Sequence, residues 1–348
     1  MVRTQGTAEI WAGERCAVRV YVARRLLLAL PTLLGITAVT FVIIQLAPGN
    51  PAAMAVRLGT EGVRSDAIAQ EIVEQTKKLY GLDKPIPVQY VLWLKRLVTF
   101  DFGTSYKDHR DVLEKIAERL PVSLQLSLTS IFLVYLIAVP IGVYSSTHQH
   151  SLSDNAITVS LFILYSLPNF WVATLLIMFL GGGDFLNVFP IYGLVSDNYV
   201  QLGFWGKVGD RLWHLVLPIT CLTYGGLASI SRFGRVGMLE AIRQDYVRTA
   251  RAKGLSEKVV IFKHAFRNSI IPIVTLLAAL LPAMLGGSVI VESIFSIPGM
   301  GHLAFESILS RDYPVIMGIT TISALLTLIG ILLADLCYAL VDPRISLE

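Results

Sequence analysis

The side chains that could perform catalysis are few in this chain, and their spacing matches no common reaction site. Of the six histidines only His148 and His150 share a loop, and two imidazoles are fewer than the four ligands of a structural zinc site. Gly206-Lys207 lacks the upstream glycine and the following Ser or Thr of a phosphate-binding loop. No HExxH or GxSxG motif occurs. We therefore expect no catalytic residue, no bound metal and no cofactor in this chain.

The three cysteines add no chemistry of their own. Cys16, Cys221 and Cys337 are far apart and have no CxxC spacing, so they indicate neither a disulfide framework nor a zinc site. Cys221 and Cys337 lie in apolar runs, and we expect them to be small buried side chains.

The distinctive stretch is a cationic segment, Arg232–Arg267, which holds nine Lys/Arg against three Asp/Glu. Apolar residues recur in it at helical spacing in two stripes: Leu239, Ile242, Tyr246 and Ala250, then Leu255, Val259, Phe262 and Phe266. Gly254 lies between the stripes, where a helix C-cap needs a residue that tolerates positive φ. Ser256 follows as a candidate N-cap. The pattern predicts two amphipathic helices joined at Gly254, outside the membrane, as a docking element for a soluble partner.

The rest of the chain is built from long uncharged runs. Only 16% of the 348 residues are charged, compared with about 25% in soluble domains. Six runs are long enough, or nearly so, to cross a bilayer core of about 30 Å. They are Leu26–Leu46, Val122–Tyr144, Ala156–Leu180, Leu215–Ser231, Ser269–Val291 and Val315–Ala334. The composition therefore predicts an all-α polytopic membrane protein.

Polar segments flank these runs. Residues 1–25 form a polar lead that is either a helix on the membrane surface or a disordered tail. The run at 26–46 is too long for a cleaved signal peptide, so we expect a retained helix. Residues 47–121 form a hydrophilic block, in which Ser65–Tyr80 and Val88–Val98 are predicted helices of a small folded lobe. Residues 339–348 form a short tail.

The distribution of Lys and Arg predicts the orientation in the membrane. With a cytoplasmic N-terminus, the inner segments hold fifteen Lys/Arg and the short outer loops hold three. We therefore expect both termini and residues 232–267 in the cytoplasm. The lobe at 47–121 would lie outside.

Polar residues near the membrane are candidates for a transport pathway. Asp335 either lines a pathway or lies at the interface, bonded to Tyr338 or Arg344. Asn169 and Phe170 follow Pro168, where a kink would expose backbone groups, although ordinary helix packing explains them equally well. The remaining candidates for a gate at the outer mouth are Glu292 and two residues of the tight turn at 296–301, Pro298 and Gly299.

Two stretches of the cationic segment carry a family resemblance. Gln244–Glu257 reads QDYVRTARAKGLSE and His264–Pro272 reads HAFRNSIIP. They resemble the permease signature loop of ATP-binding-cassette importers, in the dipeptide/oligopeptide branch. Gly254 occupies the glycine of the general signature and Ala250 its second alanine. Arg248 and Thr249 replace the usual Glu and first Ala, as is typical of the peptide branch.

The resemblance extends over nearly the whole chain after the first twenty or so residues. Other matching stretches, in chain order, are RRLLLALPTLLG (24–35), LAPGNP (46–51), LYGLDKPIPVQY (79–90), FDFGTSY (100–106), ERLPVSL (118–124), SIPGMGHL (296–303), SRDYPV (310–315) and DLCYALVDPRI (335–345).

This resemblance implies a type I ABC importer permease (MetI-like) fold with six transmembrane helices, whose core comprises residues 122–338, in a bacterial or archaeal cytoplasmic membrane. It implies a second homologous permease subunit, two ABC ATPase subunits that bind ATP and Mg, and an extracytoplasmic substrate-binding protein. Membrane lipid is the remaining partner, and no nucleic acid is expected. The residues implied to couple to the ATPase are Asp245, Tyr246, Val247, Arg248, Thr249, Ala250, Arg251, Ala252, Lys253, Gly254 and Leu255.

Transport would then proceed by alternating access driven by the partner ATPases. Peptides lead as the substrate class, although relatives of this branch also carry nickel, glutathione or oligosaccharides. Two other classes stay open. An ion-coupled secondary carrier would need coupling residues within the membrane, and a membrane scaffold or sensor would move no substrate. The exposed cations at 243, 248, 251 and 253 either contact an ATPase or only bind anionic headgroups and enforce topology.

Overall fold

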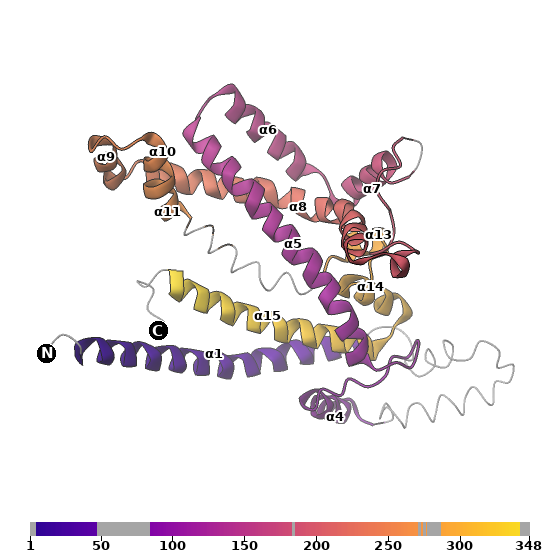
Figure 1. Cartoon of the computed structure of the whole chain (residues 1–348). Coiled ribbons are helices and arrows are strands. Elements are labelled where there is room, and N and C mark those ends of the chain that lie inside the picture. Colours follow the sequence, from indigo (N-terminus) through magenta and orange to yellow (C-terminus); the bar gives the residue numbers. More distant parts are fainter. Residues whose placement is uncertain are drawn as a thin grey trace, which may run out of the picture. The chain divides into compact units, whose positions relative to one another are not determined.

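The computed structural model describes residues 5–46, 84–182, 185–270, 273, 276 and 287–341. Within these ranges the regular secondary structure is helical (Figure 1), with two isolated β-bridges. The chain divides into two compact units. Unit 1 comprises residues 1–121, 303–332 and 346–348, and unit 2 comprises residues 122–302 and 333–345.

The helices, in chain order, are α1 (Gln5–Leu46), α4 (Ile86–Val98), α5 (Val112–Thr147), α6 (Leu152–Ser166), α7 (Asn169–Leu180), the 3-10 turn η1 (Tyr199–Gln201), α8 (Phe204–Ile242), α9 (Asp245–Ala252), α10 (Glu257–Val259), the π-helical turn η2 (Val260–Ala265), α11 (Phe266–Ser269), α13 (Val289–Ile294), α14 (Met300–Ser310) and α15 (Tyr313–Val341).

Within the described ranges, four helices are long and apolar enough to cross a membrane. They are the segments Tyr21–Ile43, Val112–Thr147, Phe204–Ile242 and Tyr313–Leu333. The pair α6 and α7 is a fifth candidate if its two parts count as one span. The expected helix Ser65–Tyr80 lies outside the described residues, as do most of the expected span Ser269–Val291 and the end of the tail.

Unit 1 contains the helix predicted at Val88–Val98, which is confirmed as α4. Pro85 occupies its N-cap and Pro87 falls in its first turn, where the missing amide costs no helical hydrogen bond. α4 packs on α1, which runs unbroken across the expected boundary at Arg25. Phe41 of α1 lies 5.3 Å from the ring of Tyr90 and 6.3 Å from that of Trp93, an aromatic contact that holds the two helices together.

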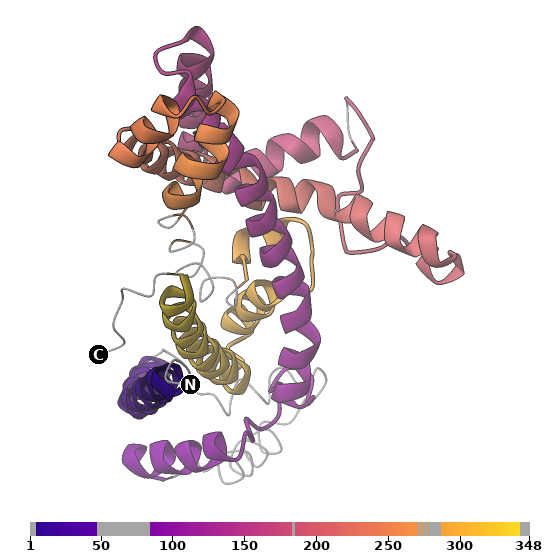
Figure 2. The same cartoon turned by 60° about the vertical axis from the view of Figure 1, so that its left-hand side comes forward.

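Unit 2 has an apolar core assembled from α5, α7, α8 and α13. Its members are Leu126, Ala173, Leu215, Leu217, Ile219, Cys221, Val291, Phe295 and Ile297, all buried. Cys221 is 1% exposed, so the expectation of a buried small side chain is confirmed there. α8 is the long support of this unit, and α9, α10 and α11 gather at its C-terminal end (Figures 1 and 2).

The third expected span, Ala156–Leu180, is wrong as a single helix. α6 and α7 meet at a bend of 100°. Pro168 has no amide hydrogen and disfavours helical geometry at the residue before it, so Leu167 is extended with φ −81° and ψ 128°. The Tyr224 hydroxyl lies 2.8 Å from the Leu167 carbonyl oxygen, which the break leaves without a helical partner.

Candidate functional site

The expected coupling residues centre on a short helix, α9, that an apolar cluster fixes to the rest of unit 2. Val247 and Ala250 are buried, with 0% and 4% of their surface exposed. They pack with Val143 near the end of α5, with α8 residues Met238 and Ala241, and with Val260 and Ala265 of η2. A displacement of α9 would therefore carry the ends of α5 and α8 with it, because interiors packed in this way resist compression.

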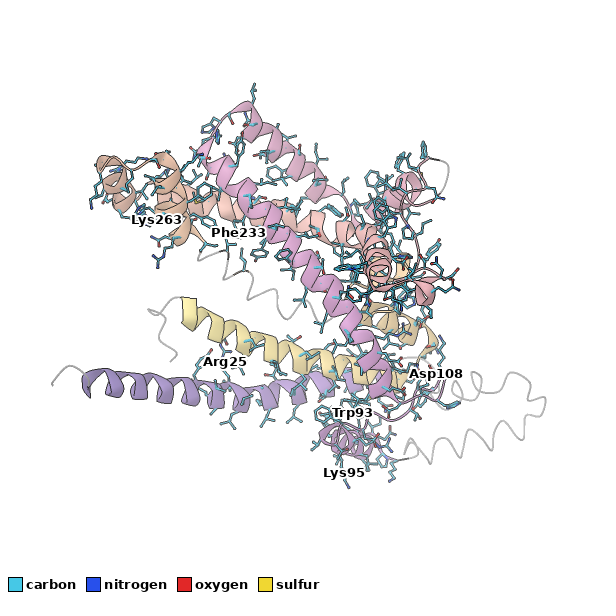
Figure 3. The ribbon with its side chains drawn as sticks, viewed as in Figure 1. Arg25, Trp93, Lys95, Asp108, Phe233 and Lys263 are labelled. Carbon is cyan, nitrogen blue, oxygen red and sulfur yellow. The ribbon has the colours of Figure 1, made fainter. Side chains whose placement is uncertain are left out.

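The other expected coupling residues, from Asp245 to Leu255, point away from this cluster. All of them except Val247 and Ala250 are exposed. The Arg248 side chain keeps 75% of its surface exposed, beside Asp245 at a long ion-pair distance of 3.7 Å. The segment thus presents a mixed face of charged and apolar side chains. Figure 3 marks Phe233 on α8 and Lys263 on η2 in the same part of unit 2.

The two predicted apolar stripes are each correct in part: Ile242, Ala250 and Phe266 contact the apolar cluster, and other members do not. The first is interrupted because α8 ends at Ile242 and α9 starts only at Asp245, so Val247, and not the exposed Tyr246, shares the inner face with Ala250. In the second stripe Leu255, Val259 and Phe262 are exposed by 41%, 37% and 63%. The π-helical turn η2 adds a residue per turn, which turns Val260 and Ala265 inward instead.

The prediction for Gly254 is confirmed. Its φ is +73°, and its amide donates to the carbonyl of Arg251 at 2.9 Å, closing the end of α9. Ser256 occupies the N-cap of α10, but its side chain makes no capping hydrogen bond.

An ion pair fastens the turn at Gly254. Arg251 Nη2 lies 2.6 Å from Glu257 Oε1 and Nε lies 3.2 Å from Oε2. The hydrogen bond holds the pKa of Glu257 below its usual range and raises that of Arg251. Arg251 therefore already has an internal partner, whereas Arg248 is the more available cation for an outside contact.

A buried carboxylate, Asp154, joins three helices next to the coupling segment. It is 1% exposed. Arg235 of α8 donates to it from Nη2 at 2.7 Å, the His150 amide donates at 3.0 Å, and Ser145 of α5 donates its hydroxyl hydrogen. Two neutral donors and one guanidinium satisfy the buried charge. We call these residues, Asp154, Arg235, Ser145 and His150, the Asp154 cluster.

A second buried carboxylate, Glu292, organises the turn at 296–301. It is 1% exposed, so its carboxylate lies inside unit 2. Its oxygens accept from the Ser123 hydroxyl at 2.8 Å, the Ser288 amide at 3.1 Å and the His302 amide at 2.9 Å. Ser123 in turn accepts from the Met300 amide at 2.7 Å. Glu292 thus caps the N-terminus of α14, where a negative charge is favourable.

The small residues of this turn leave room for the carboxylate. A Cβ on Gly299 would lie 2.5 Å from Glu292 Cδ, and one on Gly287 would lie 2.6 Å from Glu292 Oε1. Pro298 is half-buried beside them. A gating role for this turn stays a prediction.

The other pathway candidates are scattered. Asn169 lies beside the α6–α7 bend, with its side-chain oxygen 2.7 Å from the Tyr224 hydroxyl, so it supports the break through packing. Phe170 is 55% exposed. Asp335 lies in α15, partly buried. Roles of these three in a pathway stay predictions.

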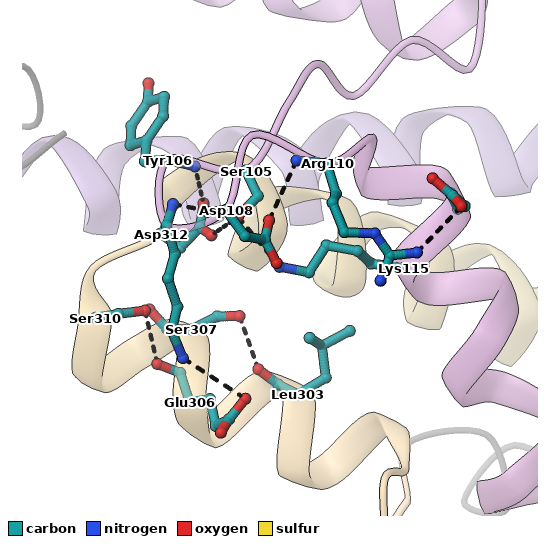
Figure 4. Close-up of polar contacts among 12 residues, drawn as sticks. Ser105, Tyr106, Asp108, Arg110, Lys115, Leu303, Glu306, Ser307, Ser310 and Asp312 are labelled. Atoms are coloured by element: carbon teal, nitrogen blue, oxygen red, sulfur yellow. Dashed lines mark hydrogen bonds and ion pairs between the residues drawn. The ribbon is translucent and has the colours of Figure 1, made fainter. Parts of the chain in front are cut away.

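Unit 1 contains a polar network between the residues before α5 and the turn that precedes α15 (Figure 4). Asp312, 1% exposed, accepts from the Ser105 hydroxyl at 2.5 Å and from the Tyr106 amide at 3.0 Å. The Lys115 ammonium donates to Asp108 at 2.7 Å. Burial pushes the pKa of Asp108 upward, but the hydrogen bonds from the Lys115 ammonium and the Arg110 amide help to hold that pKa below its usual range.

Sequence patterns did not single out Asp154 or Asp312 as buried carboxylates. A signal for Asp154 exists in Ser151-x-x-Asp154, the spacing of a capping box, and the Asp154 amide indeed donates to Ser151 Oγ at 3.1 Å. For Asp312 there is no local signal, because its partner Ser105 is far away in the sequence.

Two family models match the chain. The model for "Binding-protein-dependent transport system inner membrane component" covers residues 138–347. The N-terminal model of binding-protein-dependent transport system membrane components covers residues 18–129.

Named relatives match over almost their full length. The oligopeptide transport system permease protein AppB of Bacillus subtilis (strain 168) is 43% identical, over 94% of this chain and 99% of that protein. The peptidoglycan transport system permease protein YejB of Agrobacterium fabrum is 34% identical, over 94% of this chain and 98% of that protein. The dipeptide transport system permease protein DppB of B. subtilis is 38% identical, over 94% of this chain and 99% of that protein.

Proposed function

The chain belongs to the binding-protein-dependent transport system inner membrane components, and on that premise we propose that it is the permease of a peptide importer powered by ATP-binding-cassette subunits. We propose peptides as the substrate because the names of the relatives cite oligopeptides and dipeptides. The peptidoglycan transporter among them supports peptide-bearing cell-wall fragments as a second candidate substrate.

The observation that carries this proposal is the coupling segment. α9 presents exposed charged residues on one face and buries Val247 and Ala250 on the other. An ATPase that moves α9 would therefore move the ends of α5 and α8, which share its apolar cluster.

The complete assembly in this proposal has a second homologous permease, two ATPases and an external binding protein. Both termini would be cytoplasmic, as the Lys/Arg distribution predicts. Substrate would pass between the permeases as they alternate between outward and inward openings.

The test is reconstitution of the co-purified complex in proteoliposomes, together with the binding protein that is encoded in the same operon. Peptide uptake should require ATP and the binding protein, and ATPase subunits should co-purify in detergent. Uptake that persists on an ion gradient without ATP would identify a secondary carrier. If the complex forms and hydrolyses ATP but transports only nickel, glutathione or oligosaccharide, the chain is an importer permease and the proposed peptide substrate is wrong.

The coupling surface has its own test in Arg248→Glu. This reversal on an exposed face should weaken ATPase association, because rim charges steer docking, while the permease itself still folds. Arg251→Glu is the less direct variant, since it also breaks the pair with Glu257. If assembly and ATPase stimulation are unchanged in Arg248→Glu, Arg248 does not contribute to the interface with the ATPase.

A further inference from the structure

A groove lies among α5, α6 and α8 of unit 2, on the side of the Asp154 cluster. Its volume is about 270 Å³. Arg232, Arg235, Thr158 and two serines contribute the polar part of the lining, and side chains such as Ile141, Leu161 and Phe162 contribute the apolar part. A site with cations at one end and hydrocarbon walls along the rest suits an amphipathic anion.

The cationic end carries one uncompensated positive charge. Arg235 is matched by Asp154 at 2.7 Å. Arg232 is exposed, and among the residues that the structure describes no carboxylate pairs with it. Two positive charges and one negative charge leave a single net cation, which fits a monoanionic phosphate diester.

The hydrogen-bond donors also suit a phosphate. Arg235 Nε is buried, and no group in the described ranges accepts its hydrogen, a condition that costs free energy until an acceptor arrives. The two serines supply no donor, because Ser145 donates to Asp154 and Ser231 donates to the Leu227 carbonyl. Thr158 is a further hydroxyl in the lining. The two guanidinium groups would hold the phosphate, in the planar geometry that phosphate oxygens accept well.

The groove lies at the depth where such a ligand is abundant. α8 passes from a span into the cationic segment at Arg232, which the Lys/Arg distribution places at the cytoplasmic face. α6, which forms one wall, exposes further apolar side chains beside the groove, including Val159 and Ile163. Basic pockets between transmembrane helices on the cytoplasmic side bind anionic headgroups.

We propose that this groove binds one anionic phospholipid of the inner leaflet, with its phosphate on Arg232 and Arg235 and an acyl chain along Leu161 and Phe162. The single net charge favours a monoanionic headgroup such as phosphatidylglycerol over a zwitterionic one. The lipid would fill the space between α6 and α8 next to the Asp154 cluster.

The experiment is native mass spectrometry of the purified, delipidated complex titrated with phosphatidylglycerol or phosphatidylcholine. Wild type should prefer phosphatidylglycerol by about fivefold, the equivalent of the ~1 kcal/mol that a basic residue contributes near a membrane surface. Arg232→Gln should abolish that preference. Arg267→Gln removes an equal, exposed charge from the same cationic segment and should leave the preference intact. Ala228→Leu, which narrows the groove without a change of charge, should weaken binding of both lipids.

Four results would overturn the proposal. Equal losses in Arg232→Gln and Arg267→Gln would mean that the lipid responds to surface charge in general. Unchanged binding in Ala228→Leu would place the lipid elsewhere. Displacement of the lipid by a transported peptide would make the groove part of the transport pathway, and displacement by excess inorganic phosphate would make it a free-anion site without a lipid chain.

Discussion

At the scale of single residues, three buried carboxylates, Asp154, Glu292 and Asp312, each accept hydrogen bonds from several groups. Glu292 illustrates this, because its oxygens satisfy the amides of Ser288 and His302 while the Ser123 hydroxyl donates to it. Each donor would be left in a dry environment if the carboxylate were lost, and an unsatisfied buried donor costs about 1–3 kcal/mol. The role of Glu292 that follows from these contacts is to position α14.

Gly299→Ala tests how tightly this carboxylate is held. The new Cβ would lie 2.5 Å from Glu292 Cδ and 2.6 Å from Ser123 Oγ, so we expect a loss of about 1–3 kcal/mol from overpacking and a lower midpoint of thermal unfolding in detergent. Gly203→Ala is the matched control, because nothing lies within 4 Å of its added Cβ. Equal midpoints of thermal unfolding for the two variants would mean that the turn at 296–301 accommodates the added Cβ without loss of stability.

Asp108 allows a pH prediction with a definite sign. Against the effect of burial, Lys115 and the Arg110 amide help to hold its pKa below the usual range, so its contribution to stability is present above the unfolded pKa, about 3.9. That contribution is lost as pH falls through the lower folded value. The Asp108 side chain is 38% exposed, which limits the contribution to about 1 kcal/mol or less.

The measurement compares thermal unfolding of wild type and Asp108→Asn across pH. The variant should be less stable by a constant amount between about pH 5 and 8, because Asp108 is fully charged throughout that window. The gap should close only at more acidic pH. A gap that shrinks already between pH 8 and 6 would mean that another group dominates the network.

At the scale of helices, the Asp154 cluster connects the coupling segment to the bent pair α6–α7. Arg235 lies on α8, Ser145 on α5 and Asp154 near the start of α6. Removal of one partner from a buried ion pair leaves the other charge uncompensated, at a cost of about 3–5 kcal/mol. The cluster therefore holds α6 to α8 during any movement of α9.

Asp154→Asn should uncouple transport from ATP hydrolysis. The amide can still accept a hydrogen bond, but it no longer neutralises Arg235, so the α6–α8 contact should loosen. We expect fewer peptides transported per ATP hydrolysed, with the ATPase subunits still bound. Asp197→Asn, the same change at an exposed position, is the control. An unchanged ratio in Asp154→Asn would show that α8 moves α6 without this ion pair.

The sequence predicts those elements whose structure is determined by residues nearby in the chain. The helix at Val88–Val98 and the turn at Gly254 follow from nearby residues, and both are confirmed. The prediction that Leu255, Val259 and Phe262 are buried is wrong because η2 is π-helical. No local sequence pattern predicts a π-helical turn here. Burial of Glu292 and Asp312 depends on Ser123 and Ser105, far away in the chain, so local patterns cannot reveal it.

At the scale of the whole molecule, the asymmetry of charge predicts the orientation in the membrane. The cationic segment holds nine Lys/Arg, and short loops with such an excess stay in the cytoplasm. The block at 47–121 is nearly balanced, with eleven Lys/Arg against ten Asp/Glu, and long segments cross largely regardless of charge. ATP-driven import needs this arrangement, since the ATPases act from inside and the binding protein from outside.

Cysteine accessibility tests this arrangement directly. Lys95 and Lys263 are exposed positions, marked in Figure 3, and each is changed to Cys after Cys16, Cys221 and Cys337 are replaced by Ala. In intact cells a membrane-impermeant maleimide should label Lys95→Cys and not Lys263→Cys, because only the first would face outward. Inside-out vesicles should reverse the pattern, and peptide uptake by both variants shows that each is correctly inserted. Labelling of Lys263→Cys in intact cells would place the coupling segment beyond the reach of any cytoplasmic ATPase. Labelling of Lys95→Cys only in inside-out vesicles would place the lobe in the cytoplasm.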